Sequence, residues 1–211
     1  MTGAPEERPY VGRGALKLRH ALDAFSIDPA AMVCADFGCN VGGFTDCLLR
    51  AGAARVYAVD TGYGALDYRL RTDERVVVME RTNALHAPVP DDVRAAGGVR
   101  LVVIDMGWTP QRKAVPAALA WLAPGGSIVT LIKPHYELGP ALGPGFEDVR
   151  TRKGVLDEAD AQRITDRVIE QAPTMGVRML GVVRSPVRGG ASKGNKEGNA
   201  EWLAHFAPSE P

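Results

Sequence analysis

Short apolar runs recur along this chain and alternate with stretches of helical periodicity. Several runs are rich in valine or isoleucine, and most are flanked by Gly, Pro, Asp or Asn, which is typical of buried strands. Alternation of strand and helix predicts parallel βαβ units in an open α/β sheet. The predicted strands are Met32–Phe37, Val56–Val59, Val76–Met79, Leu101–Ile104, Ile128–Ile132, Met179–Val183 and, near the end, Glu201–Phe206.

Helical spacing of apolar residues separates these runs. The predicted helices are Gly14–Phe25, Phe44–Ala51, Ala65–Arg71, Val115–Leu122 and, approximately, Asp157–Met175. Two glycine-containing segments, Leu138–Gly154 and Gly189–Gly198, are expected to be long loops, which are often functional in a compact domain. We expect one domain over residues 11–206, with a flexible lead-in over 1–10 and a tail over 207–211.

Composition limits the classes of function. The chain has 211 residues, 45% of them hydrophobic, which suits one packed domain. Lys plus Arg equals Asp plus Glu, 25 each, so contact with a nucleic acid has to come from local basic patches. Cys34, Cys39 and Cys47 form no CxxC pair and have no histidine at zinc-ligand spacing, so reduced thiols and no metal site are expected. Without a signal peptide or a membrane-length apolar run, we expect a cytoplasmic protein that contacts no membrane.

The segment from Asp36 to Thr45, DFGCNVGGFT, follows the first predicted strand and opens a helix. Glycines let a backbone turn tightly and approach a ligand, and the helix start offers free N–H groups. The spacing is GxxxGG, so the GxGxxG fingerprint of dinucleotide-binding proteins is absent. A tight turn without a ligand is the alternative interpretation of Gly42 and Gly43.

Two polar residues follow the next strands and support a nucleotide site. Asp60 ends VYAVD, where an acid can accept hydrogen bonds from a ribose diol, although it also fits a helix cap. Asn83, in ERTN after the third strand, can pair with the polar edge of an adenine. Carboxyl ends of parallel strands meet at one edge of the sheet, so these groups favour an adenosine-containing ligand. S-adenosylmethionine (SAM) fits better than a dinucleotide.

Four charged residues suggest the chemistry. Asp105 and Lys133 end two further strands, Lys17 lies on the first predicted helix, and Glu201 begins the last strand. A lysine in a crowded site can act as a base, and neighbouring acids can tune it, so the four can take the proton from a ribose 2′-hydroxyl. Each residue alone also fits a surface charge, and Glu197 in the same loop can substitute for Glu201.

At these residues the sequence resembles the FtsJ-like 2′-O-ribose methyltransferases, most closely their TlyA-like branch. The matching text is YVGRGALKLRHALDAF, DFGCNVGGFTDCLL, RVYAVDTGYG, RVVVMERTNA, LVVIDM, APGGSIVTLIKPHYE and GNAEWLAHF. The resemblance implies a Rossmann-like seven-stranded methyltransferase sheet, mostly parallel, with helices on both faces and an antiparallel last strand. It implies a catalytic tetrad of Lys17, Asp105, Lys133 and Glu201. The expected SAM-binding residues are Asp36, Gly38, Cys39, Asn40, Gly42, Gly43, Phe44, Asp60, Asn83 and Asp105.

The resemblance also implies RNA, in particular ribosomal RNA or a ribosomal subunit, as the partner. Two features depart from the branch: the match lacks the usual N-terminal S4 RNA-binding domain, and Met-Gly-Trp-Thr-Pro follows Asp105. Trp108 and Tyr136 can stack on a nucleobase, with core packing as the alternative for Trp108. Three basic clusters can contact phosphates: Arg13, Lys17, Arg19 and His20; Arg150, Arg152 and Lys153; Arg184, Arg188, Lys193 and Lys196. A small-molecule SAM-dependent methyltransferase and a non-catalytic SAM- or RNA-binding protein remain the alternatives.

Overall fold

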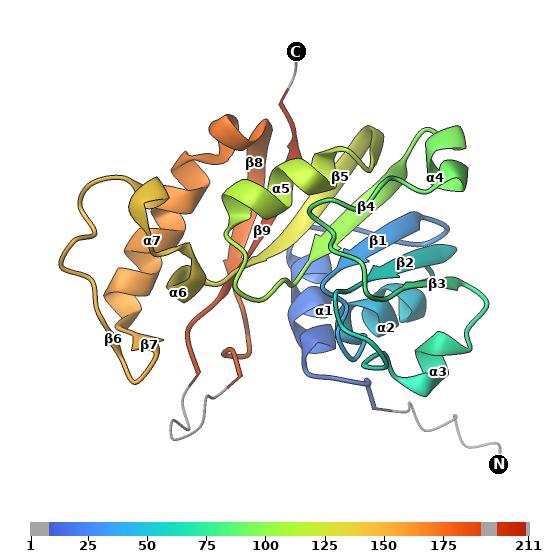
Figure 1. The fold of residues 1–211 in the computed structure, drawn as a ribbon, viewed down its shortest axis with the longest axis horizontal. Helices are drawn as coiled ribbons and strands as arrows, with labels where there is room; N and C mark the ends of the chain where they lie inside the picture. Colours follow the sequence, from blue (N-terminus) through green and yellow to red (C-terminus); the bar gives the residue numbers. More distant parts are fainter. Residues whose placement is uncertain (1–8, 191–197, 210–211) are drawn as a thin grey trace.

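The fold was obtained as a computed structural model, which describes residues 9–190 and 198–209. Seven strands of this part of the chain form one sheet in the order β3-β2-β1-β4-β5-β9-β8 (Figure 1). Strands β1 to β5 are parallel, and β9 is antiparallel to both β5 and β8. The strands are β1 Val33–Phe37, β2 Arg55–Val59, β3 Val76–Met79, β4 Val99–Ile104, β5 Leu122–Ile132, β8 Val177–Arg184 and β9 Trp202–Pro208. The expected Rossmann-like α/β fold is confirmed.

Helices cover both faces of the sheet, and a small hairpin lies outside it. The helices are α1 Gly14–Ala24, α2 Gly43–Arg50, α3 Tyr68–Arg71, α4 Asp91–Ala95, α5 Gln111–Leu119, α6 Pro134–Glu137 and α7 Glu158–Glu170, with 3-10 turns at Pro140–Leu142 and Ala172–Met175. The hairpin pairs β6 Thr151–Arg152 with β7 Val155–Leu156. No helix in the described ranges is both long and apolar enough to span a bilayer.

Two apolar cores follow from the alternation of side chains along each strand. Ala35 and Phe37 of β1 lie in the core that includes α5 and α7, whereas Cys34 lies in the core that includes α1 and α2. Strands buried on both faces need apolar residues at successive positions, which explains the continuous valine-rich runs of the sequence. The sheet is therefore a rigid central layer whose edge carries the functional loops.

Strand β9 enters the sheet between β5 and β8. Its register pairs Ile132 with Trp202 and Ile128 with Phe206. The residues just beyond the Ile132–Trp202 pair are Lys133 and Glu201, so the antiparallel pairing brings these two positions to the same edge of the sheet.

Several predicted boundaries differ from the structure. Only Tyr68–Arg71 of the predicted helix Ala65–Arg71 is helical, because the side chain of Asp67 accepts from Arg69 N and starts the helix there. Helix α5 begins at Gln111 and ends at Leu119, while Leu122 already belongs to β5. The predicted helix to Met175 is α7 followed, after Glu170, by a 3-10 turn that contains Pro173. The predicted loop Leu138–Gly154 includes a 3-10 turn and strand β6.

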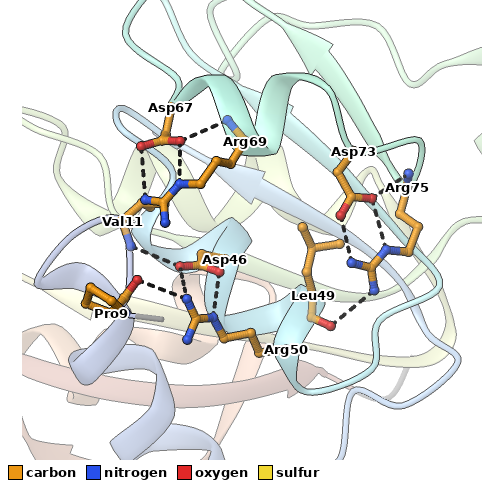
Figure 2. Close-up of polar contacts among 9 residues, drawn as sticks. All are labelled: Pro9, Val11, Asp46, Leu49, Arg50, Asp67, Arg69, Asp73 and Arg75. Atoms are coloured by element: carbon orange, nitrogen blue, oxygen red, sulfur yellow. Dashed lines mark hydrogen bonds and ion pairs between the residues drawn. The ribbon is translucent and has the colours of Figure 1, made fainter. Parts of the chain in front are cut away.

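The segment before α1 is fixed to α2 by polar contacts (Figure 2). Val11 N donates to Asp46 Oδ2 over 2.9 Å, and Arg50 Nη2 donates to the Pro9 carbonyl over 3.1 Å. Arg50 also pairs with Asp46 along the helix, and its guanidinium covers the Tyr10 ring at 4.3 Å. These contacts hold Pro9 and Tyr10 against α2.

Candidate active site

A cavity of about 620 Å³ lies where the carboxyl ends of β1, β2, β4 and β5 meet. All four residues of the predicted tetrad line it: Lys17, Asp105, Lys133 and Glu201. Eight of the ten predicted cofactor residues line it too, namely Gly38, Cys39, Asn40, Gly43, Phe44, Asp60, Asn83 and Asp105. Its volume suits a small organic ligand.

The four charged residues form two lysine–carboxylate pairs. Lys133 Nζ lies 2.5 Å from Asp105 Oδ1 and also donates to the Met106 carbonyl over 3.2 Å. Lys17 Nζ lies 2.5 Å from Glu201 Oε2. The first pair is formed by the ends of β4 and β5, and the second joins α1 to the start of β9. Both pairs border one cavity, so two ammonium groups and two carboxylates surround the same space.

Burial shifts the pKa of one member of these pairs, Glu201, and of a neighbouring histidine, His135. Burial raises the pKa of Glu201, and the neighbouring Lys17 opposes that rise. Burial and the charge of Lys133 lower the pKa of His135 to about 4, so His135 is neutral at pH 7. His135 Nδ1 is buried and has no hydrogen-bond partner among the described residues.

The glycine loop allows close approach of three backbone segments. Gly38 has φ +85°, and a Cβ there would lie 2.7 Å from the Asp105 carbonyl oxygen. Gly42, the N-cap of α2, has φ +98°, which favours glycine. A Cβ on Gly43 would lie 3.0 Å from Ala15 N, so glycine there permits the close contact of α1 with α2.

Asp60 and Asn83 fix the loops opposite the glycine loop. Asp60 accepts from Asn40 N at 2.9 Å and from Gly62 N at 2.7 Å through its two oxygens. Each carboxylate oxygen retains a further lone pair, so the group can still accept from a ligand hydroxyl. Asn83 Oδ1 accepts from Leu85 N at 3.0 Å, which orients the amide at the cavity wall.

Asp36 and Gly42 are the two predicted cofactor residues that do not line the cavity. Asp36 is fully buried, and one of its carboxylate oxygens accepts from Thr45 Oγ1 over 2.7 Å. Its other oxygen has no partner among the residues described. Burial raises the pKa of Asp36 to about 7, with a smaller contribution from the negative charge of Asp105. The sequence pattern located Asp36 next to the site but did not show that it is enclosed.

Other cavity residues were not among the predicted site residues. Gly12 and Arg13 line the cavity from the segment before α1, and Gly189 and Asn199 line it from the loop before β9. A Cβ on Gly189 would lie 2.5 Å from Glu201 Oε1, so the loop passes directly over this carboxylate. The glycine-rich composition of Gly189–Gly198 was the signal for this part of the wall.

Two aromatic side chains stand at the cavity rim. Trp108 is 84% exposed and has φ +52°, an uncommon conformation for a bulky residue. Its ring centroid lies 5.8 Å from that of Tyr136. The core-packing alternative for Trp108 is therefore wrong.

The predicted basic clusters have mixed positions. Arg13 and Lys17 line the cavity, whereas Arg19 pairs with Asp23 on the exposed side of α1. Glu158 pairs with both Arg184 and Arg188. The second cluster, Arg150, Arg152 and Lys153, lies around the β6–β7 hairpin. Lys193, Lys196 and Glu197 lie outside the described residues.

All three cysteines are buried and unpaired. Within residues 9–190 and 198–209, no three His, Cys, Asp or Glu side chains are grouped so that they can bind a metal ion.

Comparison with known proteins gives a consistent set of relatives. The model of the family described as FtsJ-like methyltransferase matches residues 10–195. The 16S/23S rRNA (cytidine-2′-O)-methyltransferase TlyA of Mycobacterium tuberculosis is 40% identical over 93% of this chain and 68% of its own length. YqxC of Bacillus subtilis, named as a proposed rRNA methyltransferase, is 37% identical over 93% of this chain and 65% of its own length. The chain thus spans about two thirds of these relatives.

Solved structures agree with this grouping. A proposed hemolysin from Streptococcus thermophilus superimposes with a TM-score of 0.82 at 34% identity, covering 98% of this chain and 70% of that one. An S-adenosylmethionine-dependent methyltransferase proposed for Listeria monocytogenes has a TM-score of 0.61 at 12% identity, covering 94% of this chain and 99% of that one, and supports the fold alone.

Proposed function

Because the chain belongs to the FtsJ-like methyltransferase family, a group of SAM-dependent enzymes, we propose that it methylates a ribose 2′-hydroxyl of RNA. The observation that carries the proposal is the presence of two lysine–carboxylate pairs and a glycine loop around one cavity. The names of the two curated relatives support ribosomal RNA, free or in a ribosomal subunit, as the substrate and hence the cytoplasm as the place of action.

The residues around the glycine loop fit SAM. Gly38 lets the loop after β1 lie directly against the Asp105 backbone, and both residues line the cavity. In our proposal Asp60 accepts hydrogen bonds from the ribose hydroxyls of the cofactor, and Asn83 binds the adenine edge. Asp36 supports the loop from behind through Thr45. When bound, SAM supplies an electrophilic methyl group on a sulfonium, which is already a good leaving group.

Lys133 is the base in the proposed reaction. Once it has released its own proton, Nζ accepts the proton of the 2′-hydroxyl while the oxygen bonds to the methyl carbon and the bond from that carbon to sulfur breaks. The ammonium that results is stabilised by Asp105 at 2.5 Å and by the Met106 carbonyl at 3.2 Å. Lys17, paired with Glu201, orients the ribose from the opposite wall. General-base catalysis of this kind contributes about 10²- to 10⁴-fold to a rate.

The rim of the cavity carries side chains that can bind an RNA strand. Trp108 and Tyr136 offer aromatic faces beside the base, and base–aromatic stacking contributes about 1–3 kcal/mol per base. Arg13 lines the cavity and can contact a phosphate, which positions the strand without reading its sequence. This local arrangement compensates for a net charge of zero.

The test is transfer of tritiated methyl from SAM to total RNA and to ribosomal subunits from a strain that lacks the gene. Label recovered as a 2′-O-methylnucleoside supports the proposal, and its position in the RNA identifies the target. Label on small molecules, with unlabelled RNA, favours a small-molecule methyltransferase. SAM binding without transfer to any acceptor favours a non-catalytic role.

A further inference from the structure

Helix α5 has an unusual N-terminal cap. Its N-cap residue is Pro110, whose side chain cannot accept a hydrogen bond. Gln111 N instead donates to both carboxylate oxygens of Glu137, over 3.0 Å and 3.2 Å. Glu137 is the last residue of α6 and lies 26 positions along the chain, so the cap of α5 comes from a different segment. A carboxylate at a helix N-terminus also interacts favourably with the helix dipole.

The side chain of Gln111 extends this contact into the sheet. Its Nε2 donates to the Leu131 carbonyl over 3.1 Å, and its Oε1 accepts from Thr130 Oγ1 over 2.7 Å. Gln111 and Thr130 are buried, and Glu137 is only 9% exposed. Buried polar groups that are fully hydrogen-bonded fix a single arrangement. Glu137, Gln111 and Thr130, here called the Glu137 network, thus join α6, α5 and β5.

The residues of the Glu137 network are close in sequence to Lys133 and Asp105. Asp105 and Met106 belong to the loop that leads into α5, and Lys133 immediately precedes α6. At the cavity, Lys133 contacts both Asp105 and Met106. Behind the cavity, Glu137 contacts the first residue of α5. The segment from Asp105 to Gln111 and the segment from Lys133 to Glu137 are therefore connected at both of their ends. One connection is the contact of Lys133 with Asp105 and Met106, and the other is the bond from Gln111 N to Glu137.

A buried carboxylate is a costly way to cap a helix. No salt bridge among the described residues includes Glu137, and burial raises its pKa to about 7, although the Gln111 N–H and the charge of Arg112 oppose the rise. A serine or aspartate at the N-cap accepts from the second or third helical residue, so the N–H of Gln111 needs an acceptor from elsewhere in the fold. The use of a distant acid therefore indicates a role in holding α5 and α6 together.

We propose that Glu137 is a positioning residue for methyl transfer, which keeps Lys133 and Asp105 at their working separation by fixing the start of α5 to α6. This inference rests on the proposed function, since it assigns Glu137 a role through Lys133 and not through contact with the substrate. Displacement of a catalytic group by about 1 Å can cost on the order of 10²-fold in rate.

The experiment compares Glu137→Met, which has similar volume and no oxygen acceptor, with Glu137→Gln, which keeps one. We expect kcat for RNA methylation to fall at least about tenfold in Glu137→Met, while the Kd for SAM and the KM for RNA stay within about threefold. Glu137→Gln restores kcat to within about threefold of the wild type. Glu170→Met, at a 70% exposed side chain of α7, is the matched control and is expected to leave all three constants unchanged.

Thermal unfolding and SAM binding establish that each variant is folded. Thr130→Val, which removes one bond from Gln111 and leaves the cap, is the milder second variant. It is expected to lower kcat about two- to fivefold with SAM binding unchanged, and it decides the matter if Glu137→Met does not fold.

Three results would overturn the inference. They are a wild-type kcat in folded Glu137→Met, a loss in Glu137→Gln as large as in Glu137→Met, and an unchanged kcat in Thr130→Val when Glu137→Met is unfolded. If the wild type methylates RNA, these results leave the proposed function intact. If the wild type methylates no RNA, the proposed function fails and this inference fails with it.

Discussion

Lys17 and Glu201 are 184 positions apart in the chain, yet Lys17 Nζ lies 2.5 Å from Glu201 Oε2. Both side chains are buried, at 10% and 3% exposure. The pair joins the first helix to the last strand across the cavity. The pair therefore contributes to the stability of the fold and is also part of the proposed active site. Mutation can separate these two roles.

Glu201→Gln is expected to lower the free energy of unfolding by about 3 kcal/mol, because it leaves the ammonium of Lys17 buried without its counter-charge. The double variant Lys17→Met, Glu201→Leu is expected to recover most of that stability, since it removes both charges. Methyl transfer is expected to be lost in both the single and the double variant. Denaturant unfolding and the tritium assay measure the two effects, and full activity in the double variant would exclude a catalytic role for the pair.

Lys133→Ala is expected to abolish turnover, with a loss of about 10²- to 10⁴-fold, while SAM still binds. The reason is that the variant removes the proposed proton acceptor and leaves the glycine loop and Asp60 in place. Isothermal titration with SAM and the methyl-transfer assay check the two parts. Lys113→Ala, at an exposed position of α5, is the control. Surviving methylation in Lys133→Ala would show that another group is the base.

Gly38→Ala is expected to lower stability by about 1–3 kcal/mol and to weaken SAM binding. Its backbone has φ +85°, and the new methyl group would lie 2.7 Å from the Asp105 carbonyl oxygen. Gly64→Ala also has a positive φ, +71°, but open space around its Cβ, and it lies outside the cavity lining, so it is the matched control. Unfolding midpoints and SAM titration of the two variants should differ clearly, and equal behaviour would contradict the close approach.

Asp36 makes stability depend on pH in a defined direction. Burial raises its pKa from 3.8 to about 7, so the folded chain binds a proton that the unfolded chain releases above pH 4. Stability from this group is therefore full below pH 4 and falls as pH rises to about 7, at up to about 1.4 kcal/mol per pH unit. Asp36→Asn removes this contribution. We expect a flatter stability profile between pH 5 and 7 in Asp36→Asn than in the wild type, with exposed Asp166→Asn as control.

Trp108→Ala is expected to raise the KM for RNA by about tenfold or more, because a stacking contact of about 1–3 kcal/mol is removed. SAM binding should not change, and stability should stay within about 0.5 kcal/mol because the indole is 84% exposed. Tyr68→Ala, at a 76% exposed tyrosine of α3, is the control. An unchanged KM for RNA would assign the exposed indole no part in substrate binding.

Much of the fold follows from local patterns. The predicted strand Val76–Met79 coincides with β3. A short run of valines between polar residues predicts a strand, because β-branched residues favour extended backbone. The GxxxGG segment and Asp60 were located because strand ends are recognisable and parallel strands bring their carboxyl ends together. Helix α6 was missed, since four residues after Lys133 are too few for a periodic signal.

What the sequence could not provide is the set of contacts between distant segments. The bond from Gln111 N to Glu137 has no local signature, and Gln111 lies outside the predicted helix Val115–Leu122. The burial of Asp36 is also a tertiary effect, because it depends on Thr45 and the packing of α2 against β1. For the same reason the sequence grouped Arg19 with Arg13 and Lys17, although α1 directs it toward solvent.

The place of β9 in the sheet has a consequence for the order of events during synthesis. The strand that lies between β5 and β8 is made after both, and Glu201 reaches Lys17 only when β9 pairs with β5. A growing chain that has produced every other strand still has an interrupted sheet and lacks one wall of the cavity. Competence for methyl transfer is therefore expected only after β9 has paired with β5, and chains that stop before Glu201 are expected to be inert.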